Sequence, residues 1–149
     1  MISLLTTLAL AASFTIHLMG DSTCAEKDLP RAGEERGWGM MLPNFLDGGV
    51  KVVNYAQNGR STKSFIDLGL WESVYGSIRE GDYVFIQFGH NDAKADDPAR
   101  YAPAWGAYQD NLRTFIDGVR EKGGTPVLLT PIARRWFKDG KLDRNCHTD

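Results

Sequence analysis

The chain has 149 residues, of which 42% are hydrophobic and 24% charged, a length and composition typical of one globular domain. Its 17 basic and 19 acidic residues leave a formal net charge of −2, and no basic run or basic stripe with aromatics occurs, so we expect no nucleic-acid partner. The apolar run at 4–12 is shorter than the roughly 20 residues of a bilayer span, so we expect no membrane partner.

Residues 1–12 have two interpretations. The run contains Ala9-Leu10-Ala11, which has the form of a signal-peptidase site, but it lacks the positively charged region that normally precedes such a run. The segment is therefore either a signal peptide, which predicts a secreted or periplasmic protein, or an N-terminal extension. Residues 13–149 form the predicted domain.

Four short apolar runs predict β-strands, and the last three follow glycine-containing turns. These strands are 14–19, 50–55, 82–88 and 125–130. Between them the sequence predicts helices over 38–46, 64–79 and 105–122. The third helix has apolar residues spaced by four, three, one and three, which fits a period of 3.6.

The alternation of strands and helices predicts an α/β fold with a doubly wound parallel sheet between two helix layers. In the common strand order 2-1-3-4, the loops that leave the first three strands meet at one point. Residues 134–149 are interpreted as a charged loop with no fifth strand and no closing helix. The sheet is therefore expected to lack its C-terminal strand and helix.

The three converging loops carry a hydroxyl and several hydrogen-bond donors. The first loop is Gly20-Asp21-Ser22, the second contains Gly59, and the third contains Asn91. Attack of a serine on an ester carbonyl creates an oxyanion, and each preorganised donor to that oxyanion contributes about 2.7 to 4 kcal/mol. The Ser22 N–H, the Gly59 N–H and the Asn91 amide provide three such donors, so the pattern favours acyl transfer with Ser22 as nucleophile.

These loops resemble the first three conserved blocks of the SGNH (GDSL) hydrolases. The similarity covers the chain from about Phe14 to its end. Further stretches resemble the rhamnogalacturonan acetylesterase branch of that superfamily. They are Gly37-Trp38-Gly39, Gly59-Arg60-Ser61-Thr62-Lys63-Ser64, Gln87-Phe88-Gly89-His90-Asn91-Asp92 and Thr130-Pro131.

The resemblance implies a flavodoxin-like sheet and a serine esterase that removes acetyl groups from plant cell-wall polysaccharide, commonly pectin. By the family pattern Ser22 is the nucleophile, and the Ser22 and Gly59 amides and the Asn91 side chain form the oxyanion hole. It implies no metal ion and no organic cofactor. An acetylated polysaccharide or oligosaccharide is the expected partner.

The family's fourth block, an Asp-x-x-His motif that supplies the base, has no counterpart among the 149 residues. His17 is interpreted as a core residue and His90 as a residue that holds the third loop. His147 is a weak substitute for the base, because the acids near it stand at −4 and +2 rather than at −3. The simplest interpretation is a truncated chain with doubtful activity.

Other candidates are weaker. Arg60, Arg134 and Arg135 lie in or near strand-end loops and are candidates for binding a uronate carboxylate, with solvated surface charge as the alternative. Cys24 and Cys146 are interpreted as free thiols, with a bridge as the alternative. Sugar stacking and core packing remain alternatives for the tryptophans, which are Trp38, Trp71, Trp105 and Trp136.

Two competing functions stay open at this point. The missing base favours a catalytically inactive fragment that binds carbohydrate. A flavodoxin-like phosphate-binding module is the second alternative, because Ser22-Thr23 follows a strand and can present backbone N–H groups. No G-x-G-x-x-G or Walker pattern is present to support it.

Overall fold

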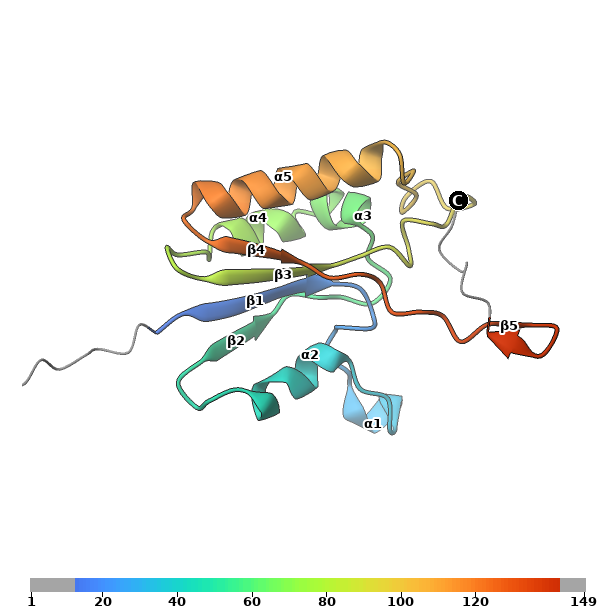
Figure 1. The fold of residues 1–149 in the computed structure, drawn as a ribbon, viewed down its shortest axis with the longest axis horizontal. Helices are drawn as coiled ribbons and strands as arrows, with labels where there is room; N and C mark the ends of the chain where they lie inside the picture. The colour runs from blue at the N-terminus through green and yellow to red at the C-terminus, as the bar shows by residue number, and fades with distance from the viewer. Residues whose placement is uncertain (1–12, 143–149) are drawn as a thin grey trace, which may run out of the picture.

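The structure is a computed structural model that describes residues 13–142 (Figure 1). The interpretations of residues 1–12, Cys146 and His147 lie outside the described residues. Within residues 13–142 no helix is long and apolar enough to cross a membrane.

A four-stranded parallel sheet forms the centre of the fold, in the order β2-β1-β3-β4. Its strands are β1 (Thr15–Gly20), β2 (Lys51–Asn54), β3 (Tyr83–Gln87) and β4 (Thr125–Leu128). The predicted order 2-1-3-4 is therefore confirmed. Because β1 lies between β2 and β3, the loops that follow these three strands lie at the same edge of the sheet.

Helices cover both faces of the sheet, as predicted (Figure 1). One face carries α3 (Thr62–Asp67), α4 (Leu70–Tyr75) and α5 (Ala107–Glu121), and the other carries α2 (Trp38–Met41) and the 3-10 helix η1 (Leu42–Phe45). The short helix α1 (Leu29–Ala32) lies on the same side as α2, farther from the sheet, and buries no residue. The larger core lies under α3, α4 and α5 and includes Phe65, Phe88 and Phe115. The smaller core lies under α2 and η1 and includes Leu18 and Cys24.

Two predicted helices are each divided in the structure. The predicted helix 38–46 is α2 followed by η1, because Pro43 has no N–H for the i to i−4 bond and the chain tightens into a 3-10 turn. The predicted helix 64–79 is α3 and α4, separated at Gly69, whose φ of 70° is left-handed. The short helix α1 was not predicted at all.

The prediction that residues 134–149 form only a charged loop is wrong for the part that is described. A two-stranded antiparallel hairpin forms there, with β5 (Phe137–Lys138) and β6 (Lys141–Leu142). Asp139 and Gly140 join the strands with φ values of 51° and 73°. Asp-Gly is a preferred pair for a tight hairpin turn, because both positions require positive φ. The hairpin is separate from the main sheet.

Candidate active site

The serine turn begins where β1 ends. The Asp21 carbonyl accepts hydrogen bonds from the N–H groups of Cys24 (3.1 Å) and Ala25 (3.0 Å), which closes the turn around Ser22. The Asp21 carboxylate is fully buried and its Oδ1 accepts a hydrogen bond from the Thr23 N–H at 2.9 Å. These bonds use main-chain groups and the Asp21 side chain, so the hydroxyl of the half-buried Ser22 is not needed to form the turn.

Glycines let neighbouring chain segments approach the turn closely. A Cβ on Gly20 would lie 2.8 Å from the Gln87 carbonyl oxygen of β3. A Cβ on Gly37 would lie only 2.1 Å from the Ala25 carbonyl oxygen, and one on Gly39 would lie 2.6 Å from that of Cys24. The Gly37-Trp38-Gly39 stretch therefore packs directly against the backbone that follows Ser22.

A partly buried polar network also supports the turn. The Trp38 indole Nε1 donates to Gln87 Oε1 at 2.6 Å, and the Thr23 hydroxyl lies 3.0 Å from the same oxygen. Gln87 Nε2 donates in turn to the Thr130 carbonyl at 3.1 Å. The Trp38 side chain is thus anchored in this network, which favours packing over sugar stacking for this residue.

The second loop is tied to the serine turn by Lys27, which the sequence interpretation missed. Lys27 Nζ donates to the Ser22 carbonyl at 2.7 Å and to Asn58 Oδ1 at 3.2 Å, and it pairs with Glu35 at 2.7 Å. The Lys27 side chain is 4% exposed. Gly59 follows Asn58 with a φ of 74°, a conformation that favours glycine.

The third loop meets the second loop through Asn91. The Asn91 side chain is buried, and its Nδ2 donates to the Arg60 carbonyl at 2.8 Å. The structure therefore brings the loops of Ser22, Gly59 and Asn91 together at the carboxyl edge of the sheet. Donors at this point can stabilise a negative charge that develops next to a serine.

Asp92 joins the third loop to the start of α3. Its Oδ1 accepts from the Thr62 N–H at 2.9 Å and from the Thr62 hydroxyl at 2.5 Å, while Asn111 Nδ2 donates to that hydroxyl at 3.0 Å. Asp92 Oδ2 is buried with no hydrogen-bond partner among the described residues. Burial raises the pKa of Asp92 to about 6 from 3.8, against the lowering effect of the Thr62 hydrogen bonds.

Protonation of Asp92 is expected to change stability with pH. The folded state binds this proton more tightly than the unfolded state, so the folded state loses stability as pH rises through the window from about 4 to about 6. The expected loss is roughly 2 to 3 kcal/mol. Urea unfolding at several pH values in this window gives the free energy of unfolding of the wild type and of Asp92→Asn, which cannot ionise at this position. The loss due to Asp92 is the difference between the two pH profiles. Parallel pH profiles for the two proteins would contradict the raised pKa.

His17 lies within β1, three residues before Gly20, and its side chain binds an acid at the amino edge of the sheet. His17 Nε2 lies 3.0 Å from Asp82 Oδ2, and Asp82 directly precedes β3, at the amino edge. Burial opposes the charge of Asp82, but the Thr15 N–H and the His17 side chain hold its pKa below the ordinary value. This buried pair therefore ties the middle of β1 to the start of β3, away from the serine turn.

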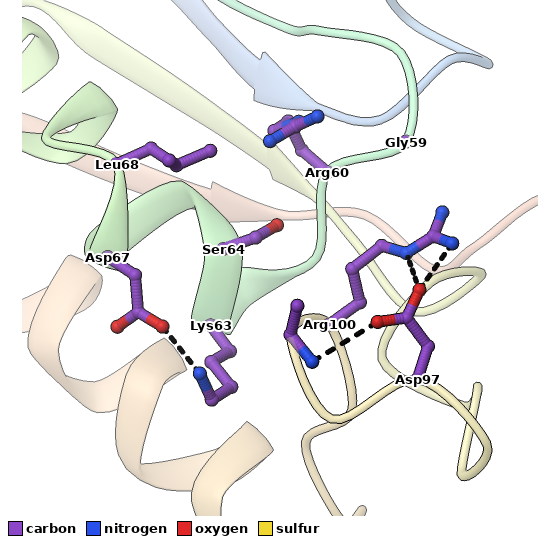
Figure 2. A pocket seen from close by; sticks show the side chains of 9 residues that line it. Gly59, Arg60, Lys63, Ser64, Asp67, Leu68, Asp97 and Arg100 are labelled. Atoms are coloured by element: carbon purple, nitrogen blue, oxygen red, sulfur yellow. Dashed lines mark hydrogen bonds and ion pairs between the residues drawn. The ribbon is translucent and has the colours of Figure 1, made fainter.

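The arginine candidates occupy different places. Arg60 lines an open pocket of about 390 Å³ next to Gly59, together with Lys63, Arg100 and Asp97 (Figure 2). Arg134 reaches the third loop, where its Nη2 donates to the His90 carbonyl at 2.7 Å, and its guanidinium lies 4.8 Å from the centre of the Trp136 ring. Arg135 is exposed.

The remaining candidates divide by exposure. Trp71 is buried in the larger core, whereas Trp105 is 88% exposed. Burial, together with the charge of Asp21, raises the pKa of the free Cys24 thiol to about 12, so this thiol is not a reactive nucleophile. In the described part of the chain no group of three or more His, Cys, Asp or Glu side chains could hold a metal ion.

A parallel sheet in this order, with a serine turn and two donor-bearing loops at its carboxyl edge, places the chain among the SGNH-type hydrolases. The model of the GDSL-like lipase/acylhydrolase family matches residues 18–147. The chain belongs to this family.

Several relatives carry names that agree with the predicted branch. The chain is 37% identical over 131 residues to a probable rhamnogalacturonan acetylesterase, YesY, of Bacillus subtilis, a match that covers 88% of this chain and 56% of YesY. It is 38% identical over 132 residues to the rhamnogalacturonan acetylesterase RhgT of the same organism, covering 86% of this chain and 53% of RhgT. A rhamnogalacturonan acetylesterase of Emericella nidulans is 35% identical over 87% of this chain and 50% of its own length. The chain thus spans about half the length of the curated relatives it matches.

The fold also agrees with solved structures. The crystal structure of YxiM from Bacillus subtilis matches with a TM-score of 0.71 and 30% identity, covering 83% of this chain and 34% of YxiM. A possible lipase from Chitinophaga pinensis matches with a TM-score of 0.56 and 23% identity, over 81% of this chain and 49% of its own, which supports the fold alone.

Proposed function

We propose that the protein is a serine esterase that removes O-acetyl groups from plant cell-wall polysaccharide, with acetylated rhamnogalacturonan as the substrate. The observation that carries this proposal is the meeting of three loops at the carboxyl edge of the sheet, in which Ser22 lies next to the loops of Gly59 and Asn91. The printed names of YesY, RhgT and the Emericella nidulans enzyme support the choice of substrate.

In the proposed reaction the Ser22 oxygen attacks the acetyl carbonyl carbon while a general base accepts the hydroxyl proton. The N–H groups of Ser22 and Gly59 and the Asn91 amide then stabilise the oxyanion. Collapse of the tetrahedral intermediate releases the sugar hydroxyl and leaves an acetyl group on Ser22. Water hydrolyses this ester to acetate and restores the serine.

The general base that would accept the Ser22 proton distinguishes this scheme from a second candidate function. None of the 149 residues forms an Asp-x-x-His block. The second candidate function is binding of an acetylated sugar without turnover, in which the same three loops hold the acetyl group. The two functions differ in one measurable respect, because only the esterase releases acetate.

The pocket next to Gly59 is the proposed binding site for a negatively charged group of the substrate. Arg60 lines this pocket, and its Nε donates to the Asn58 carbonyl at 3.3 Å. A guanidinium can bind a carboxylate through two parallel hydrogen bonds. The proposal therefore assigns Arg60 to a uronate carboxylate of the polysaccharide, with Arg134 and Arg135 as further contacts beyond the third loop.

Acetate release from three substrates tests the proposed function. We expect release from acetylated rhamnogalacturonan and from p-nitrophenyl acetate, and slower release from acetylated xylan, because its backbone offers no uronate to Arg60. Arg60→Gln is expected to raise KM about tenfold for rhamnogalacturonan and to leave KM for p-nitrophenyl acetate unchanged, since about 1.4 kcal/mol of charged hydrogen bonding is lost. Binding of acetylated oligosaccharide without any acetate release would instead support the second candidate function.

A further inference from the structure

The orientation of the Asn91 carboxamide is fixed by charge on one side and by a carbonyl on the other. Its oxygen accepts from Lys94 Nζ at 2.9 Å and lies 3.4 Å from Arg100 Nη1. Its nitrogen faces the Arg60 carbonyl at 2.8 Å. A flipped amide would place its NH₂ against two cations and its oxygen against a carbonyl, so only the observed orientation satisfies all three neighbours.

Lys94 and Arg100 follow Asn91 in the third loop at a regular spacing of three residues. Asn91, Lys94, Asp97 and Arg100 are each three positions apart. Successive turns connect them. The Lys94 N–H donates to the Asn91 carbonyl at 3.3 Å, the Asp97 N–H to the Lys94 carbonyl at 2.9 Å, and the Arg100 N–H to the Asp97 carbonyl at 2.9 Å. The loop therefore winds through consecutive turns, and the two cations return to the Asn91 oxygen.

Arg100 is itself held in place. Asp97 accepts from Arg100 Nε at 2.5 Å and pairs with its Nη2, so the carboxylate binds the guanidinium at two nitrogens (Figure 2). A Cβ on Gly59 would lie 3.6 Å from Arg100 Nη1, which places the guanidinium against the second loop. Arg100 therefore lies close to Gly59, which bears one of the three proposed oxyanion donors, and within hydrogen-bond range of the side-chain oxygen of Asn91, which bears another.

We propose that Lys94 and Arg100 are positioning residues that fix the Asn91 carboxamide in the donor orientation and polarise its N–H bonds. This inference rests on the proposed function for its catalytic consequence only. Positive charge at the amide oxygen draws electron density from the nitrogen, which makes the N–H a stronger donor. One N–H binds the Arg60 carbonyl, and the second has no acceptor among the described residues, so it is available to an oxyanion.

Nuclear magnetic resonance of the uniformly ¹⁵N-labelled chain tests the positioning without any need for turnover. The Asn91 side-chain NH₂ signals are identified by their loss in Asn91→Asp. We expect these signals to move upfield in Lys94→Met and in Arg100→Gln, because the N–H bonds are then less polarised. Lys94→Arg and Arg100→Lys keep the charge and are expected to restore most of the wild-type shift. Unchanged Asn91 signals in folded Lys94→Met and Arg100→Gln would overturn the proposal.

Kinetics with p-nitrophenyl acetate tests the consequence for catalysis. Each neutral variant is expected to lower kcat about tenfold with little change in KM, and the double variant about 100-fold, because loss of a whole oxyanion donor costs about 10² to 10³. A purely structural role would instead lower thermal stability and leave kcat per folded molecule unchanged, which would overturn the catalytic part.

A control variant, Arg113→Gln, shows whether the changes in the Asn91 signals and in kcat result merely from the loss of an ion pair. Arg113 pairs with Asp110 at 2.7 Å on the exposed side of α5, and Arg113→Gln is expected to leave both the Asn91 signals and kcat unchanged. If the wild type releases no acetate, the proposed function fails. The Asn91 signals then still decide whether the two cations hold the amide.

Discussion

Ser22→Ala is expected to lower the rate of acetate release at least about 10³-fold, because the acetyl group then has no protein oxygen to accept it. The remaining donors can still stabilise an oxyanion formed by water, so a small residual rate is expected rather than none. Acetate assays on acetylated rhamnogalacturonan and p-nitrophenyl acetate measure the change. KM is expected to stay within a few-fold, since the substitution removes only one oxygen from the binding surface.

The fold of Ser22→Ala is expected to be unchanged. The turn is closed by bonds from Cys24 and Ala25 to the Asp21 carbonyl, and the Ser22 carbonyl remains available to Lys27 Nζ. Ser73→Ala is the matched control, because it removes an exposed serine hydroxyl on α4. Equal rates for wild type, Ser22→Ala and Ser73→Ala would show that Ser22 is not the nucleophile.

The strands could be predicted from the sequence because each combines an apolar run with a nearby glycine turn. Four parallel strands can be ordered in many ways, but the common doubly wound order was sufficient to place the three loops at one edge. The breaks within the helices were also present in the sequence, as Pro43 and Gly69, yet a periodic pattern alone does not show where a helix ends. The Asp139-Gly140 turn could have been recognised, because this pair has a specific hairpin geometry.

The sequence was sufficient to place the loops of Ser22, Gly59 and Asn91 at one edge of the sheet, but it did not show which residues hold these loops together. Lys27 lies in no recognisable motif, and only the structure shows its ammonium between the Ser22 carbonyl and Asn58. Lys94 and Arg100 lie in a loop whose consecutive turns bring them back to Asn91. Contacts of this kind depend on how a loop winds, and residue spacing by itself does not give the direction of a side chain.

Phe65→Ala is expected to reduce the free energy of unfolding by about 3 to 5 kcal/mol, a large share of the roughly 5 to 15 kcal/mol typical of a domain. Phe65 is fully buried on α3, and its ring packs edge-to-face against Phe88 at 5.3 Å and Phe115 at 6.3 Å between centres. Removing the ring leaves a cavity between the sheet, α3 and α5. Urea unfolding followed by tryptophan fluorescence measures the loss.

The position of Phe65 also predicts an effect on the site. Phe65 is three residues beyond Thr62, whose N–H and hydroxyl bind Asp92, the neighbour of Asn91. A loosened α3 would let the second and third loops separate, so acetate release is expected to fall at temperatures where the variant is still folded. Leu68→Ala is the matched control, because Leu68 follows α3 and is 58% exposed. A loss of stability in Leu68→Ala as large as that in Phe65→Ala would contradict the assignment of Phe65 to the core. The expected effect of Phe65 on the loops, through Thr62 and Asp92, would then have no physical basis.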